Sequence, residues 1–276
     1  MLQTFNQGLD SFISMEQLAT MCPVAFKSLP TNPALSEHYT QVNTSTVLED
    51  LAKLNWFPVT ATMRKNRKPD TIFSAHMVSL QNSDLVIKGA NGDDAFVRII
   101  LQNSHDGFSS FKFSVGLYRL ICSNGLIIST AEFSNYKIKH IGYSFKELQN
   151  VINQVVSDLP NHIETLNHMQ DIILTPAEQH SLALQALKLR VGIKPEEAME
   201  YEEETIEEML LPLREMDEGD NLWLVLNRIQ ERIIRGGFRA AINGKKPRMF
   251  KPIKSFETDL KLNKDLFLLA SNMISA

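Results

Sequence analysis

Cysteine is scarce in this sequence, and long apolar runs are absent. Cys22 and Cys122 are the two cysteines among 276 residues, and their spacing is not that of a metal-binding pair. So few cysteines argue against a disulfide scaffold and predict a reduced, cytoplasmic protein. Residues 1–14 lack the basic start and apolar run of a signal peptide. Because no stretch approaches the ~18–20 apolar residues that cross a bilayer, we expect no membrane partner.

The short motifs of familiar enzymes are also absent. The sequence has no phosphate-cradling glycine loop, no Gly-x-Ser-x-Gly elbow, no His-Glu-x-x-His run and no Cys-x-x-Cys pair. Each motif places a nucleophile, metal or phosphate in a defined geometry, so these absences argue against familiar hydrolases, kinases and NTPases. We expect no catalytic residue and no cofactor, although several histidines could serve as ligands for a divalent metal.

What is present is globular in composition and uneven in charge. Hydrophobic residues make up 43% of the chain and charged residues 22%, and the net charge is −4. Residues 196–220 contain twelve acidic residues and one arginine, whereas residues 228–254 contain nine basic residues and one acid. The first block predicts an exposed helix or loop, and the second a cationic surface.

The order of sequence patterns predicts an α+β fold. Residues rich in β-branched and aromatic side chains alternate with Gly, Asn and Asp clusters, which is typical of an antiparallel meander. Strands are expected at residues 59–63, 72–80, 95–102, 108–122 and 126–133, with a possible further arm at 85–88. Hairpin turns are expected at residues 91–94 and 105–107.

Helical spacing indicates long helices packed on this sheet and a mostly helical C-terminal half. Apolar residues recur at helical intervals in residues 14–21, after Asn43 or Thr44, from Phe145 onward and in residues 221–234. The run at residues 175–178, Thr-Pro-Ala-Glu, is a capping box that should open a helix ending at Gly192. We expect an N-terminal arm (1–43), an α+β core domain (44–192), an acidic linker or helix (193–220) and a basic helical region (221–276).

A dense polar motif follows one predicted strand: Asn103, Ser104, His105, Asp106 and Gly107. Such residues build a tight turn, but they could also contact a ligand, a phosphate or a metal. A metal site needs three or four ligands, so His105 and Asp106 would need His76 and His140 to complete one.

A second motif runs from Arg119 to Gly125. Cys122 lies among apolar residues and is expected to be packed, and the residues after it resemble a turn. Arg119 is an arginine within an apolar strand, so it should pair with a carboxylate or reach a phosphate.

Two groups of basic residues are candidates for nucleic-acid binding. One is the turn formed by Arg64, Lys65, Arg67 and Lys68; the other comprises Arg232, Arg235, Arg239, Lys245, Lys246, Arg248 and Lys251. Phe238 and Phe250 are interleaved in the second group. A charge run also fits a merely solvated surface, but cations with aromatics suit a nucleic-acid backbone and its bases. The acidic block could shield this surface, in which case deleting residues 196–208 should tighten binding.

These motifs together resemble a phage-, prophage- and plasmid-borne family of unknown function typified by the YfjQ and YafZ proteins. The matching text is HMVSL at 76–80, RIILQNSHDGFSSFKFSVGLYRLICSNGLII at 98–128, KHIG at 139–142, LTPAEQHSLALQALKLR at 174–190 and NLWLVLNRIQERIIRGGF at 221–238. The resemblance implies a mobile-element context of replication, recombination and defence evasion, and it implies no mechanism. In addition, the order helix, antiparallel sheet, long helix is similar to the core of single-strand annealing recombinases, whose subunits assemble into rings or helices; this likeness is one of topology alone.

The leading expectation is a DNA-metabolism protein that binds single-stranded nucleic acid, anneals it without covalent catalysis and forms homo-oligomers. The two basic groups would bind phosphates, with His105 and Arg119 near the groove. One alternative is a metal-dependent hydrolase or nuclease using His76, His105, Asp106 and His140. Another is an interaction protein that counters host defence through its acidic block and binds a host protein.

Overall fold

The computed structural model describes residues 12–26, 43–63, 75–87, 95–104, 111–119, 125–126, 137–138 and 144–274. Backbone contacts divide the chain into two units. The N-terminal unit comprises Met1–Gly125 and Ser129–Asp158, and the C-terminal unit comprises Leu126–Ile128 and Leu159–Ala276. The sequence placed a boundary after Gly192, whereas this division falls inside one helix, α3 (Phe145–Asp171).

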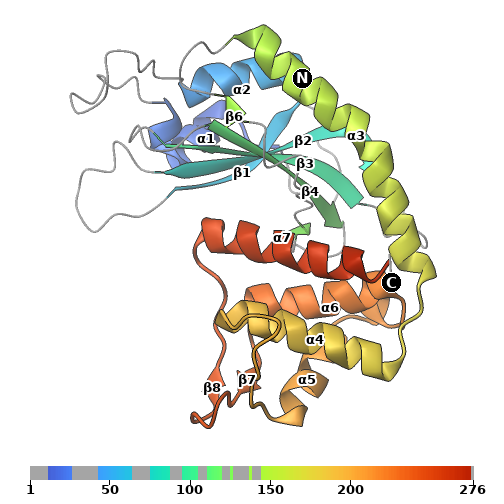
Figure 1. Cartoon of the computed structure of the whole chain (residues 1–276). Coiled ribbons are helices and arrows are strands. Elements are labelled where there is room, and N and C mark those ends of the chain that lie inside the picture. Colours follow the sequence, from blue (N-terminus) through green and yellow to red (C-terminus); the bar gives the residue numbers. More distant parts are fainter. Residues whose placement is uncertain are drawn as a thin grey trace. The chain divides into compact units, whose positions relative to one another are not determined.

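The N-terminal unit is built on an antiparallel sheet, which confirms the predicted meander (Figure 1). Neighbouring strands follow one another in sequence: β1 (Phe57–Met63), β2 (His76–Ile87), β3 (Ala95–Asn103) and β4 (Phe111–Arg119). Two short strands extend the sheet beside β4, β5 (Gly125–Leu126) and β6 (Lys137–Ile138). The arm expected at 85–88 is the end of β2, which continues past an irregularity between Gln81 and Val86. The expected turns at 91–94 and 105–107 lie outside the described residues.

The core of this unit forms where α2 meets the sheet. Helix α2 (Thr44–Lys53) begins after Asn43, as the sequence predicts, and buries Val47, Leu48 and Leu51. Figure 1 shows α2 against the sheet, and it contacts β1. The central strand β3 alternates its side chains between faces. Because consecutive residues from Phe96 to Leu101 are all buried, both of its faces are covered.

Part of the segment expected to be an arm contributes to this core. Helix α1 (Met15–Met21) starts with a capping box between Ser14 and Gln17, and a 3₁₀ turn, η1 (Pro23–Phe26), follows. Both helices contact structured neighbours, α1 with β1 and η1 with α2. Leu18 and Cys22 are fully buried, and burial raises the pKa of the Cys22 thiol to about 11. This cysteine therefore acts as a packed apolar group.

The C-terminal unit is helical, as expected. Its helices are the second half of α3, α4 (Pro176–Val191), α5 (Glu203–Leu210), α6 (Leu222–Arg235) and α7 (Phe256–Asn272). Figure 1 shows α4, α6 and α7 side by side, and each contacts the other two. Gly192 ends α4 with a φ of 77°, as predicted, and Asn221 caps α6.

A small hairpin of β7 (Arg239–Ala240) and β8 (Arg248–Met249) joins α6 to α7. Within the described residues, no helix is both long enough and apolar enough to cross a membrane.

Candidate anion-binding site

The hairpin β7–β8 is fixed to the helical core at the end of α6. Gly236 has a φ of +70°, and a Cβ there would lie 2.3 Å from the carbonyl oxygen of Phe250. This position therefore requires glycine. The close approach lets Gly237 N donate to Phe250 O (2.9 Å), and Phe250 N donates to Phe238 O (2.9 Å). The chain before β7 and the chain after β8 are thus held together.

Two phenylalanine rings complete this anchor. Phe238 and Phe250 stack with 4.7 Å between ring centroids and 7° between ring planes. Phe238 is fully buried and Phe250 is 6% exposed. The sequence suggested that these rings could stack on nucleic-acid bases, but they are buried against each other. They position the hairpin instead.

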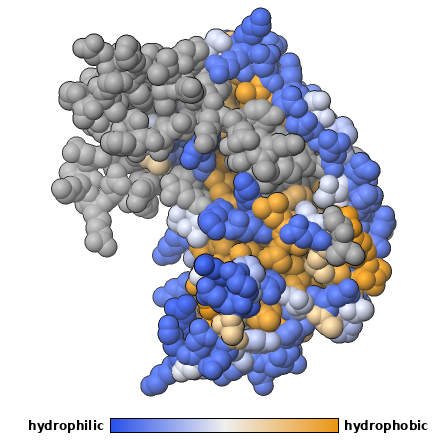
Figure 2. Space-filling model, in the orientation of Figure 1, coloured by the Kyte–Doolittle hydropathy of each residue, from blue (hydrophilic) through white to orange (hydrophobic). Residues whose placement is uncertain are grey.

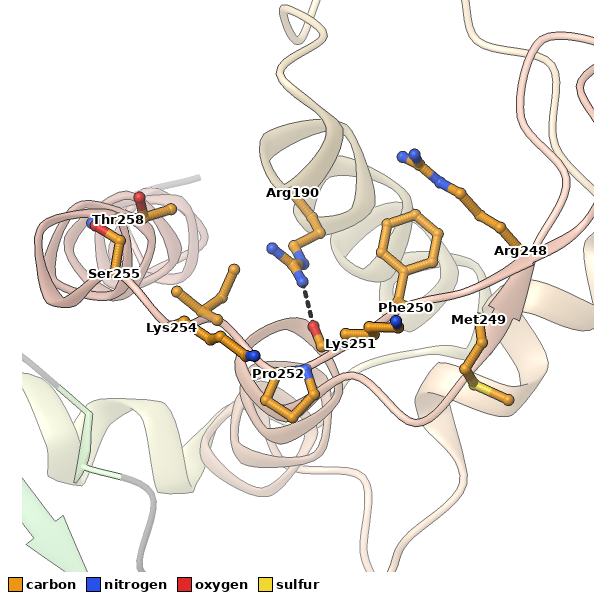
Figure 3. Close-up of a pocket in the computed structure, with 10 residues that line it drawn as sticks. Arg190, Arg248, Met249, Phe250, Lys251, Pro252, Lys254, Ser255 and Thr258 are labelled. Carbon is orange, nitrogen blue, oxygen red and sulfur yellow. Dashed lines mark hydrogen bonds between the residues drawn. The ribbon is translucent and has the colours of Figure 1, made fainter. Parts of the chain in front are cut away.

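Beside Phe250 lies a pocket of about 430 Å³ (Figure 3). Its walls come from the last turn of α4, from β8 and the segment after it, and from the first turn of α7. The described residues that line it include no acid and four cations, which are Arg190, Arg248, Lys251 and Lys254. The pocket is therefore strongly positive.

Arg190 is held in place by the segment that follows β8. Its Nη2 donates to the carbonyl oxygen of Lys251 at 2.7 Å, although the two residues are 61 positions apart. Its guanidinium carbon lies 5.7 Å from the centroid of the Phe250 ring. Its Nε is buried and has no hydrogen-bond partner among the described residues. The ion pairs of the described residues include none for this arginine, which is oriented by the Lys251 carbonyl.

Arg248 brings a second guanidinium to the same ring. Its guanidinium carbon lies 4.9 Å from the Phe250 centroid, and Figure 3 shows the ring between the two arginines. Burial, and secondly the positive charge of Arg248, lower the pKa of Arg190. Arginine side chains titrate far above neutral pH, so Arg190 stays charged despite this lowered pKa. Like charges held this close are stabilised by a bound anion.

The start of α7 adds to the positive potential. Ser255 caps this 17-residue helix, and its hydroxyl accepts from Thr258 N at 3.3 Å. The first turn of a helix carries partial positive charge, which favours anions and disfavours a nearby cation such as Lys254. Phosphate, sulfate and carboxylate groups are the chemistry that this arrangement suits.

Exposed cations continue from the pocket over the hairpin. They are Arg235, Arg239, Lys245, Lys246, Arg248, Lys251 and Lys254. Figure 2 shows a hydrophilic surface over β7 and β8. Within the part of the chain that the structure describes, Lys245, Lys246 and Lys251 form no ion pair. We call this set the basic hairpin surface.

The acidic block lies against this surface through backbone contacts. Asn243 N donates to Glu200 O (2.9 Å), and Glu200 N donates to Asn243 Oδ1 (3.0 Å). Arg239 N donates to the carboxylate of Glu208 at 3.3 Å. Helix α5, inside the block, buries Ile206 and Met209 and contacts α4 and α6. The block is therefore a docked part of the unit.

In the N-terminal unit, part of the polar motif forms a buried hydrogen-bond cluster. Thr44 Oγ1 lies 2.8 Å from His76 Nε2 and accepts from Asn103 Nδ2 at 2.9 Å. Asn103 Oδ1 accepts from Ser104 N at 2.8 Å. None of the four residues is more than 3% exposed. The cluster joins the start of α2 to the start of β2 and the end of β3, which is a structural role.

Comparison with known proteins matches residues 33–267 to the family "Domain of unknown function (DUF932)". The chain belongs to this family. It is 29% identical over 268 residues to the UPF0380 proteins YafZ and YfjQ of Escherichia coli (strain K12), covering 96% of this chain and 93% of each relative. No solved structure matches. The resemblance predicted from the motifs is thereby confirmed, and the family name states no activity.

The metal site considered for this DUF932 chain stays a prediction. His76 is in the buried cluster with Thr44, whereas His105, Asp106, Gly107 and His140 lie outside the described residues. Among the described residues, no group of three or more His, Cys, Asp or Glu side chains could hold a metal ion.

The structure describes only some of the cations that the sequence singled out. Arg232 is on α6 and is 9% exposed, so it is poorly placed to meet a polymer. Arg119 is the last residue of β4 and pairs with Ala95, and its side chain is not described. The turn of Arg64, Lys65, Arg67 and Lys68 lies outside the described residues.

Sequence reasoning missed part of the pocket. Lys254 is the last cation of the basic block but is not among the candidate residues, and Arg190 lies within the helix expected to end at Gly192. Ser255 and Thr258, which also line the pocket, were likewise overlooked. The available signal was local: a cation in the last turn of α4 and a serine before α7. Nothing local indicates that these positions meet.

Proposed function

We propose that this chain binds single-stranded nucleic acid through its C-terminal unit, as a DNA-metabolism protein of mobile elements acting in the cytoplasm without covalent catalysis. The observation that carries the proposal is the pocket beside the exposed basic hairpin surface, because the described residues that line it include four cations and no acid. A pocket followed by a row of cations suits a polymer with repeating negative charge.

The proposed binding is electrostatic. Lysines and arginines that contact phosphates release condensed counterions, so the affinity falls as salt rises. Lys245, Lys246 and Lys251 would contact the sugar-phosphate backbone, and the pocket would hold one phosphate more firmly. With Phe238 and Phe250 buried, the described part of this surface offers phosphate contacts more than base stacking, which favours binding with little sequence preference.

Strand annealing and self-association on the strand are the finer part of the proposal. The element order helix, antiparallel meander and long helix supports them by its likeness to annealing recombinases, which is topological. We expect the protein to speed the annealing of two complementary oligonucleotides. The mass of the protein particles should also rise with protein concentration.

Salt titration tests the binding itself. Fluorescence anisotropy of a labelled single-stranded oligonucleotide should show affinity that falls steeply between about 50 and 200 mM salt. The double variant Lys245→Gln/Lys246→Gln should bind several-fold more weakly at the lower salt concentration. Each lost phosphate contact should also reduce the salt slope by about 0.7.

The matched control is Lys194→Gln/Lys261→Gln. It removes the same charge from the same unit, but each of these exposed lysines already faces an acid, Glu197 or Asp265. It should bind like the unsubstituted protein. Absence of binding at about 50 mM salt, or binding indifferent to salt, would refute the proposal.

A further inference from the structure

We infer that the pocket is a receptor for a terminal phosphomonoester, so that this protein holds the phosphorylated end of a nucleic-acid strand. The inference deepens the proposed function and rests on it. It separates two tasks: the basic hairpin surface contacts the backbone, and the pocket recognises the end.

The charge of the pocket favours a monoester over a backbone phosphate. An internal phosphodiester carries one negative charge, whereas a terminal phosphomonoester carries about 1.5 to 2 at neutral pH. The described residues that line the pocket include four cations and no acid, and the first turn of α7 adds partial positive charge. A nearly dianionic group offsets this excess better than a monoanion does.

Three separate elements line the pocket: the end of α4, the chain around and after β8, and the start of α7. Its volume of about 430 Å³ is within the range of small-ligand sites, so it has room for a phosphate and part of a nucleotide.

The arginines are oriented before any ligand binds. Arg190 is fixed by Lys251 O, and Arg248 lies over Phe250 (Figure 3). Phe238 stacks on the Phe250 ring. A guanidinium has several donors in one plane and can bond two phosphate oxygens at once. A terminal phosphate has three free oxygens, whereas an internal phosphate has two. The terminal phosphate can therefore accept more hydrogen bonds from the two arginines.

Two acids with described side chains on neighbouring elements, Asp259 and Glu208, have other hydrogen-bond partners. Asp259 is the acid nearest to Ser255 on α7 with a described side chain, and it accepts from Asn263 Nδ2 at 2.6 Å. Glu208 of the acidic block accepts from the backbone of Arg239. Neither side chain lines the pocket.

The test compares three strands of one sequence that carry a 5′-phosphate, a 3′-phosphate or hydroxyls at both ends. Anisotropy with the full-length protein should show about tenfold tighter binding of one phosphorylated strand than of the hydroxyl strand. Arg248→Gln, at an exposed position, should abolish that preference, and Arg248→Lys should restore it in part. Lys245→Gln/Lys246→Gln should weaken all three strands equally and keep the preference.

Arg190→Gln should also abolish the preference, with circular dichroism checking that α4 remains folded. A nucleoside monophosphate should compete with the phosphorylated strand more strongly than inorganic phosphate does, which separates a nucleotide end from a free ion. Equal binding of all three strands, with normal salt dependence, overturns this inference and leaves the proposed function standing. Absence of binding by all three overturns both.

Discussion

At the scale of single residues, Asp259 is the described acid whose pKa is most clearly raised by burial. It accepts from Asn263, whose own Oδ1 accepts from Gln230 of α6 at 2.8 Å. Burial raises the pKa of Asp259 to about 6, although the hydrogen bond from Asn263 acts in the opposite direction. The folded protein therefore holds this proton at pH values where the unfolded chain has lost it.

This difference predicts how stability depends on pH. Between about pH 4 and 6 the folded state binds more protons at Asp259, so its contribution to stability falls as pH rises and is lowest above about 6. Asp259→Asn removes the charge but keeps an acceptor for Asn263. It should raise the free energy of unfolding by roughly 1–3 kcal/mol above pH 6, with a smaller gain near pH 4.

Urea unfolding of the variant and the unsubstituted protein at about pH 4.5, 5.5 and 7.5 measures this gain. The exposed Glu164→Gln on α3 serves as a control and should follow the unsubstituted protein at each pH. A gain that does not change with pH would contradict burial as the cause.

At this scale the sequence indicated the candidate site only in part. Arg248 and Lys251 stand out in the basic block, because nine cations in a short run are visible without a structure. Arg190 does not stand out, since a cation in the last turn of a helix is ordinary. Its bond to Lys251 O depends on how α4 and the chain after β8 come together. Arg232 is buried and therefore does not belong to the exposed basic surface, and a count of charges in the sequence cannot detect this burial.

At the scale of elements, the start of α4 is defined by a capping box. Thr175 Oγ1 accepts from Glu178 N at 3.3 Å, and Glu178 Oε2 accepts from Thr175 N at 2.8 Å and from Thr175 Oγ1 at 2.7 Å. The side-chain bond, and secondly the backbone bond, from Thr175 lower the pKa of Glu178. Because α4 contacts α5, α6 and α7, this cap supports the whole helical unit.

Thr175→Ala should therefore lower the free energy of unfolding by about 1 kcal/mol. Chemical denaturation followed by circular dichroism measures the loss. Thr20→Ala is the comparison, because its exposed hydroxyl donates to Glu16 O inside α1 and caps no helix terminus. It should change stability by less than about 0.5 kcal/mol. Equal losses in the two variants would show that the capping box contributes nothing of its own.

The elements that the sequence predicts best are those with local signals. The starts of α2 and α4 and the glycine that ends α4 agree with the caps read from residue types. The shape of β2 was less accessible, because an irregularity inside one strand resembles the break between two. The segment expected to be an arm contains α1, whose burial depends on contacts with β1.

At the scale of the molecule, the acidic block and the basic hairpin surface are neighbours within the C-terminal unit. The contact runs through Glu200, Asn243 and Arg239, mostly by backbone atoms. Deleting residues 196–208 would remove Ile206 from the core, so deletion would confuse folding with shielding. Substitution that keeps the shape of each side chain is the cleaner experiment.

Glu200→Gln/Glu208→Gln should tighten binding of a single-stranded oligonucleotide a few-fold at low salt. The amides keep the shape of the glutamate side chains and remove two negative charges beside the cations. The gain in affinity should shrink as salt rises, because the Debye length is about 10 Å at 0.1 M salt. Anisotropy measures the effect, and Glu147→Gln/Glu164→Gln on α3 removes equal charge elsewhere. An affinity that stays the same for the Glu200/Glu208 variant would show that the acidic block does not shield the surface.

The sequence by itself determined the family, the α+β class, most helix boundaries and the presence of opposed charge blocks. These depend on periodicity, caps and composition, which act over a few residues. Only the tertiary structure decided that Phe238 and Phe250 stack on each other, that Asn103 and Ser104 are buried, and that Arg190 lies at the pocket with Lys254. The reason is physical: these contacts join residues far apart in sequence, and the packing of whole elements determines them.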